Sequence, residues 1–135
     1  MTTVFFAGGG TGGHLMPALA IADAMVRLDG SVCPFFLGSR RGIEANVLPQ
    51  RPWPYELLPM EPLRRRQWWR NGSLPLSLLR SVHRVGRLCA EHRPAAVVGT
   101  GGYAAGPVVW AAARRGVPAI LQEQNAFPGL ATRWL

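Results

Sequence analysis

The 135-residue chain is 48% hydrophobic, which is enough apolar material for one domain with a buried core and excludes a disordered chain. It has no apolar run long enough to span a bilayer and no secretory signal at its N-terminus, so we expect a cytoplasmic protein. Its net charge of +8 comes from arginine without any lysine and predicts an anionic partner. Cys33 and Cys89 lie in a strand-like and a helix-like run, which favours free thiols over a disulfide.

Short apolar runs alternate with helix-like segments along the chain. Residues 4–7 predict a buried first strand, residues 8–13 a glycine loop, and residues 17–28 a helix with Pro17 in its first turn. Further strands are predicted at residues 33–37, 55–58, 96–99 and 119–121. Further helices are predicted at residues 43–48, from a cap at Ser73 to His92, at residues 105–114, and from residue 129 onwards. This order predicts an α/β fold, a Rossmann-like parallel sheet with helices on both faces.

Three glycine-rich or polar segments follow predicted strands, at residues 8–14, 99–107 and 122–129. The carboxyl ends of parallel strands share one edge of a sheet, and ligands bind there. The first segment has five glycines in six residues and leads into a helix, whose free N–H groups attract anions, so we favour a diphosphate site over a plain turn. Gly101, Gly102 and Tyr103 repeat this arrangement, with a glycine-rich packing turn as the alternative.

Polar side chains accompany these loops. His14 stands where the first loop becomes a helix, and its imidazole suits either a general base or a hydrogen bond to the loop backbone. Glu123, Gln124 and Asn125 follow the fifth strand and suit hydrogen bonds to sugar hydroxyls, unless Asn125 caps a following helix. The first loop also matches the dinucleotide-binding pattern, and the arginines after the second strand suit a 2′-phosphate, so an NADP oxidoreductase is a minor alternative.

The segment from Glu61 to Arg93 carries most of the positive charge, together with two tryptophans and several leucines. Tryptophan favours the membrane interface and arginine attracts anionic headgroups, so we expect this segment to contact an anionic membrane surface. The predicted contact residues are Arg64, Arg65, Arg66, Trp68, Trp69, Arg70 and Leu74. Val82, Val85 and Cys89 are expected to face the core instead. Nucleic-acid binding competes as an explanation of the charge, but no recognised motif accompanies it, so we expect no nucleic-acid partner.

Four groups of residues, in order along the whole chain, resemble the signatures of the MurG family of glycosyltransferases. They are residues 9–14 with 17–20, residues 37–44, residues 101–103 with 106–107, and residues 123–126 with 128–130. The chain departs from the family pattern at Gln122, where histidine is usual, and at Pro62, where glycine is usual. Together the four signatures are highly specific.

The resemblance implies a GT-B glycosyltransferase of two domains. Residues 1–135 would form an incomplete N-terminal, acceptor-binding domain, without the C-terminal domain that binds most of the donor. The implied reaction is inverting transfer from UDP-N-acetylglucosamine to lipid I, which gives lipid II in peptidoglycan synthesis. It would need no bound metal and no cofactor. The implied location is peripheral, on the cytoplasmic face of the inner membrane.

The resemblance also assigns roles to single residues. His14 would be the catalytic base, the glycine loops would hold the acceptor diphosphate, and the donor would be reached by Thr11, Gly12, Gly13 and Asn125. The other expected substrate contacts are Gly101, Gly102, Tyr103, Glu123 and Gln124. We expect these 135 residues alone to be inactive. The alternative function is a non-catalytic, membrane-bound subunit that binds the acceptor and recruits a separate donor-binding partner.

Overall fold

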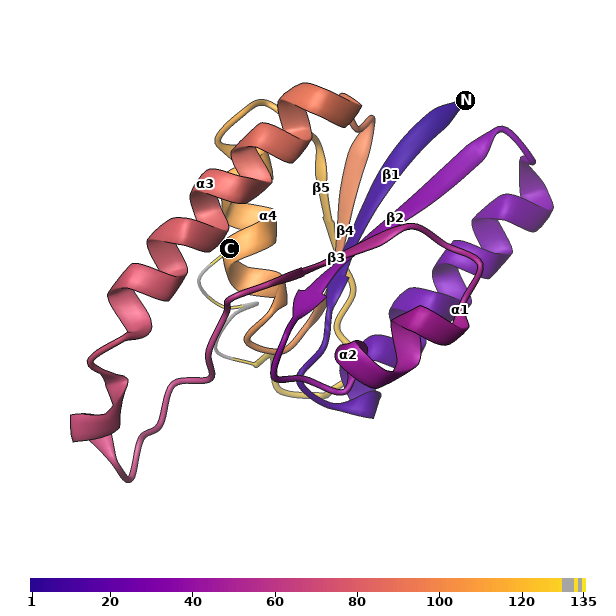
Figure 1. Ribbon diagram of the computed structural model, residues 1–135. Helices are drawn as coiled ribbons and strands as arrows, with labels where there is room; N and C mark the ends of the chain where they lie inside the picture. The colour runs from indigo at the N-terminus through magenta and orange to yellow at the C-terminus, as the bar shows by residue number, and fades with distance from the viewer. Residues whose placement is uncertain (130–132, 134) are drawn as a thin grey trace.

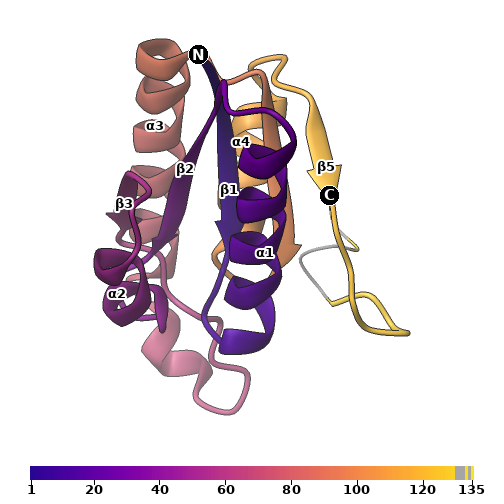
Figure 2. The same ribbon diagram turned by 90° about the vertical axis from the view of Figure 1, so that its right-hand side faces the viewer.

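Five parallel strands form one sheet in the order β3-β2-β1-β4-β5 (Figure 1). They are β1 (Thr2–Gly8), β2 (Val32–Ser39), β3 (Tyr55–Leu58), β4 (Ala96–Gly101) and β5 (Ala119–Leu121). The computed structural model describes residues 1–129, 133 and 135. Because all strands run in one direction, their carboxyl ends meet at a single edge, the lower one in Figure 2. The predicted parallel α/β sheet is confirmed.

Helices cover both faces of this sheet (Figures 1 and 2). One face carries α1 (Gly12–Leu28), α2 (Glu44–Val47) and the short 3-10 helix η1 (Leu48–Gln50), and the other carries α3 (Leu74–His92) and α4 (Ala105–Ala113). Side chains of β1 alternate between the two cores: Phe6 stacks on Phe36 beneath α1, whereas Phe5 packs with Val85 of α3. The predicted core-facing positions Val82, Val85 and Cys89 all pack in this second cluster, as expected.

The first helix begins at Gly12, five residues earlier than predicted, so Pro17 lies inside it rather than in its first turn. Proline has no N–H to donate to the carbonyl four residues before it, which here is Gly13. The side chain of Gln124 donates to this carbonyl instead, with 2.7 Å between Nε2 and the oxygen. The helix therefore tolerates Pro17 because another part of the chain supplies the missing donor.

Other boundaries differ in smaller ways. Strands β1, β2 and β4 extend one or two residues into the glycine-rich and polar positions that the apolar runs excluded. The predicted helix at residues 43–48 is divided into α2 and η1, with Pro49 inside η1. Ser73 does precede α3, but its hydroxyl donates to Glu61 and caps no helix N–H. Most of the helix expected from residue 129 lies outside the described residues.

Both cysteines are free thiols, as predicted. Cys33 is half-buried on β2, and Cys89 is buried on the core side of α3. Burial raises the pKa of the Cys89 thiol, and the nearby Arg115 only partly opposes this effect.

The orientation of α3 can be tested with two leucines. Leu88 is 1% exposed in the core, and Leu79 is 65% exposed on the same helix. We expect Leu88→Ala to lower the free energy of unfolding by about 2–5 kcal/mol, because it leaves a cavity. Leu79→Ala is the matched control and should change it by less than about 0.5 kcal/mol. Urea unfolding measures both, and equal losses would contradict this orientation of the helix.

Candidate functional site

Three consecutive backbone amides at the start of α1 make no hydrogen bond to any residue that the structure describes. They belong to Thr11, Gly12 and Gly13, whereas the amides of His14 and Leu15 both donate to the Thr11 carbonyl at 3.2 Å. Thr11 occupies the N-cap position, but its side chain makes no capping hydrogen bond, and the first turn contains no acidic residue. The positive end of the helix dipole is thus left uncompensated, which is the arrangement of an anion-binding site.

The second glycine loop packs directly against the first. The amide of Gly9 donates to the Gly101 carbonyl at 3.4 Å, and Thr100 Oγ1 donates to the His14 carbonyl at 2.5 Å. Gly102 has a φ of 82°, and a Cβ at this position would collide with the Gly9 carbonyl, so only glycine allows this approach. The two loops predicted to meet at the sheet edge therefore form one continuous backbone surface.

Tyr103, a predicted substrate contact, uses its hydroxyl within the protein. The hydroxyl donates to Ser39 Oγ at 3.2 Å, and the ring lies so close to Gly10 that a side chain there would strike it. Tyr103 thereby joins the loops that follow β1, β2 and β4. Its ring still lines the cavity described below, so it remains available for an apolar contact.

The imidazole of His14 is oriented by the second loop. Its Nδ1 lies 3.2 Å from the Thr100 carbonyl and 3.2 Å from Gln124 Nε2. A carbonyl can only accept, so the contact with Thr100 is a hydrogen bond in the tautomer that carries the ring proton on Nδ1. In that tautomer Nε2 keeps the lone pair, and it makes no hydrogen bond to a described residue. The backbone contact and the base role proposed for His14 are thus compatible.

The loop after β5 is organised by Glu123. Its Oε1 accepts from both the backbone and side-chain nitrogens of Asn125, and its Oε2 accepts from the Gly129 amide, each at 3.0 Å. The Asn125 side chain therefore helps to close this loop. The helix that it would cap in the alternative lies mostly outside the described residues. Gln124 ties the same loop to α1. Gln122, the departure noted above, has a buried Oε1 without a hydrogen-bond partner among the described residues.

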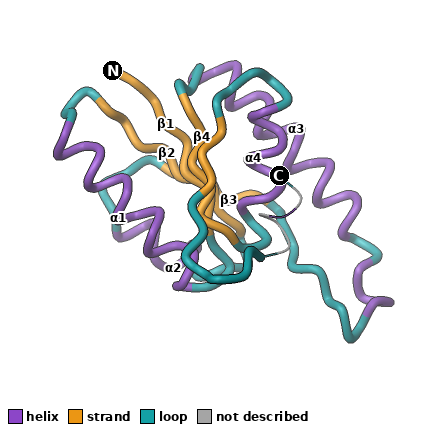
Figure 3. The backbone as a smooth tube through the Cα atoms, turned by 180° about the vertical axis from the view of Figure 1, so that it is seen from behind, coloured by secondary structure: helices purple, strands orange, loops and turns teal. Residues whose placement is uncertain are grey.

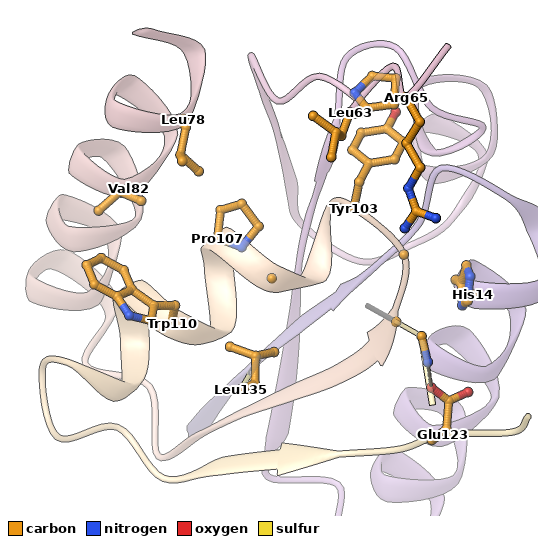
Figure 4. Close-up of a pocket in the computed structure, with 15 residues that line it drawn as sticks. His14, Leu63, Arg65, Leu78, Val82, Tyr103, Pro107, Trp110, Glu123 and Leu135 are labelled. Carbon is orange, nitrogen blue, oxygen red and sulfur yellow. Dashed lines mark hydrogen bonds between the residues drawn. The ribbon is translucent and has the colours of Figure 1, made fainter. Parts of the chain in front are cut away.

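A cavity of about 820 Å³ adjoins these loops. Figure 4 shows Leu78 and Val82 of α3 opposite Trp110 of α4, with His14 and Glu123 at the other end. The rest of the lining comes from Pro62, Leu63, Arg65, Gly101, Gly102, Tyr103, Gly106, Pro107, Gly129 and Leu135. Sequence analysis missed this cavity, because it depends on how α3 packs beside α4. Its polar end and apolar wall suit a ligand with a charged head and a hydrocarbon tail.

The arginine- and tryptophan-rich segment extends away from the sheet between β3 and α3 (Figure 3). It includes the 3-10 helix η2 (Trp68–Asn71), and its tryptophans are 74% and 65% exposed. Arg65, Arg66 and Arg70 are exposed too, but Arg64 and Leu74 are half-buried. The exposed leucines of this region are Leu63, Leu76, Leu78 and Leu79. Leu74, the predicted membrane contact, is half-buried, whereas Ser77 and Ser81 lie on the buried side of α3.

Three observations concern a 2′-phosphate site, a metal site and a membrane-spanning helix. Arg40 Nε donates to the Leu57 carbonyl, and Arg41 lies 3.6 Å from Glu61, so both arginines have partners on or after β3. Within residues 1–129, 133 and 135, no three His, Cys, Asp or Glu side chains are grouped to hold a metal ion. In the same part of the chain, no helix combines the length and hydrophobicity that crossing a bilayer requires.

Comparisons with known proteins agree with this geometry. Residues 4–135 match the glycosyltransferase family 28 N-terminal domain. Two curated relatives carry the name UDP-N-acetylglucosamine–N-acetylmuramyl-(pentapeptide) pyrophosphoryl-undecaprenol N-acetylglucosamine transferase. The relative from Moorella thermoacetica is 44% identical over 132 residues, covering 98% of this chain and 36% of its own length. The relative from Myxococcus xanthus is 41% identical over 139 residues, covering 100% and 35%.

The crystal structure of MurG from Acinetobacter baumannii is similar with a TM-score of 0.83 and 29% identity, covering 99% of this chain and 38% of that one. The present chain therefore spans about a third of the length of the relatives that it matches. The resemblance seen in the sequence motifs is confirmed over nearly the whole chain. The chain belongs to glycosyltransferase family 28, and its residues 4–135 fall in the N-terminal domain of that family.

Proposed function

We propose that this chain is the acceptor-binding, membrane-facing part of an enzyme that transfers N-acetylglucosamine from UDP-N-acetylglucosamine to lipid I. The names of the relatives support this reaction, and their greater length supports a second, donor-binding domain outside these residues. In this proposal the transfer involves only the two substrates, with no cofactor or metal held by this chain. The product would be lipid II, the lipid-linked precursor of peptidoglycan.

One observation carries the proposal. The amides of Thr11, Gly12 and Gly13 have no partner among the described residues, and they directly precede His14, which lines a cavity whose far wall is hydrocarbon. The resemblance gave these three residues a contact with the donor. We propose the diphosphate of the lipid-linked acceptor for their amides instead, because the wall suits the first units of its polyprenyl chain. A soluble nucleotide cofactor has no hydrocarbon tail to bury against such a wall.

His14 is proposed as the general base. Its Nε2 would take the proton from the C4 hydroxyl of N-acetylmuramic acid while that oxygen bonds to the anomeric carbon of N-acetylglucosamine and the bond to UDP breaks. The attack comes from the side opposite UDP, so the configuration at the anomeric carbon inverts. The contact of Nδ1 with the Thr100 carbonyl supports this role, because it leaves Nε2 without a partner among the described residues on a side chain that lines the cavity.

The segment around η2 is proposed to rest on the anionic inner face of the cytoplasmic membrane. Trp68, Trp69 and the neighbouring arginines are exposed, and three exposed leucines of α3 continue the same region. Such a surface holds a protein at the headgroup level without a spanning helix. It would also bring the cavity to the place where a lipid-linked acceptor is found.

The lipid-binding role predicts a preference for longer prenyl chains. We expect the chain to bind farnesyl diphosphate at least about tenfold more tightly than dimethylallyl diphosphate, because the longer ligand buries more hydrocarbon on the same charged head. Leu78→Asp should remove this difference, whereas Leu79→Asp, which lies outside the cavity, should preserve it. Isothermal titration calorimetry measures the affinities, and equal binding of both diphosphates would argue against a lipid-linked acceptor.

The proposed membrane role predicts that only substitutions on the side that carries η2 weaken binding to anionic vesicles. Each arginine near an anionic surface contributes about 1 kcal/mol, so Arg66→Ala with Arg70→Ala should weaken binding to phosphatidylglycerol vesicles by about thirtyfold. Arg27→Ala with Arg51→Ala removes the same charge from exposed positions on the face of α1 and η1, and should have little effect. Vesicle sedimentation measures both variants. Tighter binding to oligonucleotides than to vesicles would support a nucleic-acid partner instead.

The role of His14 is tested in a hybrid in which this chain replaces the matching N-terminal third of the Moorella thermoacetica relative. His14→Gln should lower kcat by about 10²–10⁴-fold with a much smaller change in KM, because a general base acts in the transition state. His83→Gln, at an exposed position on α3, is the control and should leave kcat unchanged. A hybrid that keeps its kcat without His14 would exclude the residue as the base.

A further inference from the structure

Glu44 is a fully buried carboxylate to which the proposed reaction gives no task. It is the first residue of α2, and its exposed fraction is 0%. Its Oε1 accepts from the Ser39 amide and its Oε2 from the Gly10 amide, each at 3.0 Å. It forms no ion pair with any of the described arginines. A buried carboxylate held only by backbone N–H groups is costly, so its presence at this sheet edge calls for a reason.

The surrounding backbone is shaped around this one side chain. A Cβ at Gly9 or at Gly42 would collide with the Glu44 carboxyl group. These glycines come from different loops, one after β1 and one after β2. Part of the glycine content of the first loop therefore makes room for Glu44 rather than for a ligand.

Glu44 also determines which amides of the first loop remain free. Gly10 has a φ of 85°, so the chain turns sharply there and directs its N–H at Glu44. The next three amides, at Thr11, Gly12 and Gly13, are those without a partner in the part of the chain that the structure describes. A turn fixed at Gly10 fixes the directions of the amides that follow. Donors that are already oriented bind an anion better than donors that must be ordered on binding.

The hydrogen bonds of Glu44 belong to a wider network. Ser39, which donates its amide to Glu44, also donates its hydroxyl to the Met60 carbonyl at 2.9 Å and accepts from the Tyr103 hydroxyl. Glu44 thus links the first glycine loop to the loops after β2 and β4. Removing its carboxylate would release the first loop from this support.

We infer that Glu44 is a positioning residue that holds the first glycine loop in the conformation that binds a diphosphate. The inference rests on the proposed function of that loop. The direction of the change in diphosphate affinity distinguishes this role from simple electrostatic repulsion. A negative charge close to a diphosphate repels it, so loss of the charge alone would strengthen binding. Loss of the support that Glu44 gives to the loop would weaken it.

The test is Glu44→Gln, which keeps the size of the side chain but places an amide NH₂ against one of the two backbone N–H groups. We expect binding of dimethylallyl diphosphate and of farnesyl diphosphate to weaken by the same factor, about tenfold or more, because both ligands share the diphosphate. Isothermal titration calorimetry on the full 135-residue chain measures this. The matched control is Glu56→Gln, whose carboxylate is paired with Arg84 at 2.5 and 2.7 Å and contacts no glycine loop. It should lower the thermal midpoint without changing either affinity.

Unchanged or tighter binding by Glu44→Gln would overturn the inference, and so would an equal loss of affinity in Glu56→Gln. Should Glu44→Gln fail to fold, amide hydrogen exchange in the unaltered chain decides. The Gly10 amide must then exchange slowly without ligand, while the Thr11, Gly12 and Gly13 amides become protected only when farnesyl diphosphate is added. Fast exchange at Gly10 would reject the inference. Failure of the unaltered chain to bind either diphosphate would instead reject the proposed function.

Discussion

Unsatisfied N–H groups at the start of α1 are the feature on which the site depends. Every helix leaves its first amides without internal acceptors, and most proteins cap them with a nearby side chain or an acidic residue. Here Thr11 gives no side-chain cap and the first turn has no acid, so the amides of Gly12 and Gly13 have no acceptor among the described residues. An external anion is a suitable partner for such a helix end.

The sheet topology then brings other groups to that helix end. Because β1 and β4 are neighbours, Thr100 at the end of β4 can orient the ring of His14 through its carbonyl. Because α3 and α4 lie side by side on one face, their apolar side chains form a wall close to the same loops. A charged head, a reactive hydroxyl and a hydrocarbon tail would each find its matching surface within one region. This combination favours a lipid-linked acceptor over a soluble ligand.

Sequence reasoning succeeded where one local signal dominates. Short apolar runs predicted all five strands, three of them ending at glycine, and the order of elements predicted the parallel sheet. It failed where a contact with a residue distant in the sequence determines the local structure. The start of α1 was misplaced because Pro17 usually marks a first turn, and only the contact with Gln124 explains its place in the interior. The buried face of α3 was predicted only in part, because Ser77 and Ser81 lie on it beside the expected Val85 and Cys89.

Among the site residues, the Thr11–Gly13 amides could be predicted, since glycines before a helix signal an open amide cluster. Glu44 could not be singled out, because a lone glutamate in a short segment is usually exposed. Its burial depends on glycines in two loops that only the fold brings together. The cavity likewise arises from the packing of two helices that are separated in the sequence by β4.

Pro17 has an effect well beyond its own helix turn. An ordinary residue at this position would bring an N–H that competes for the Gly13 carbonyl and would weaken the bond that ties the loop after β5 to α1. Because Pro17 lacks this N–H, the Gly13 carbonyl is available to Gln124, more than a hundred residues away in the sequence. Substitutions at Pro17 that look harmless for helix stability would therefore loosen the loop that carries Glu123 and Asn125.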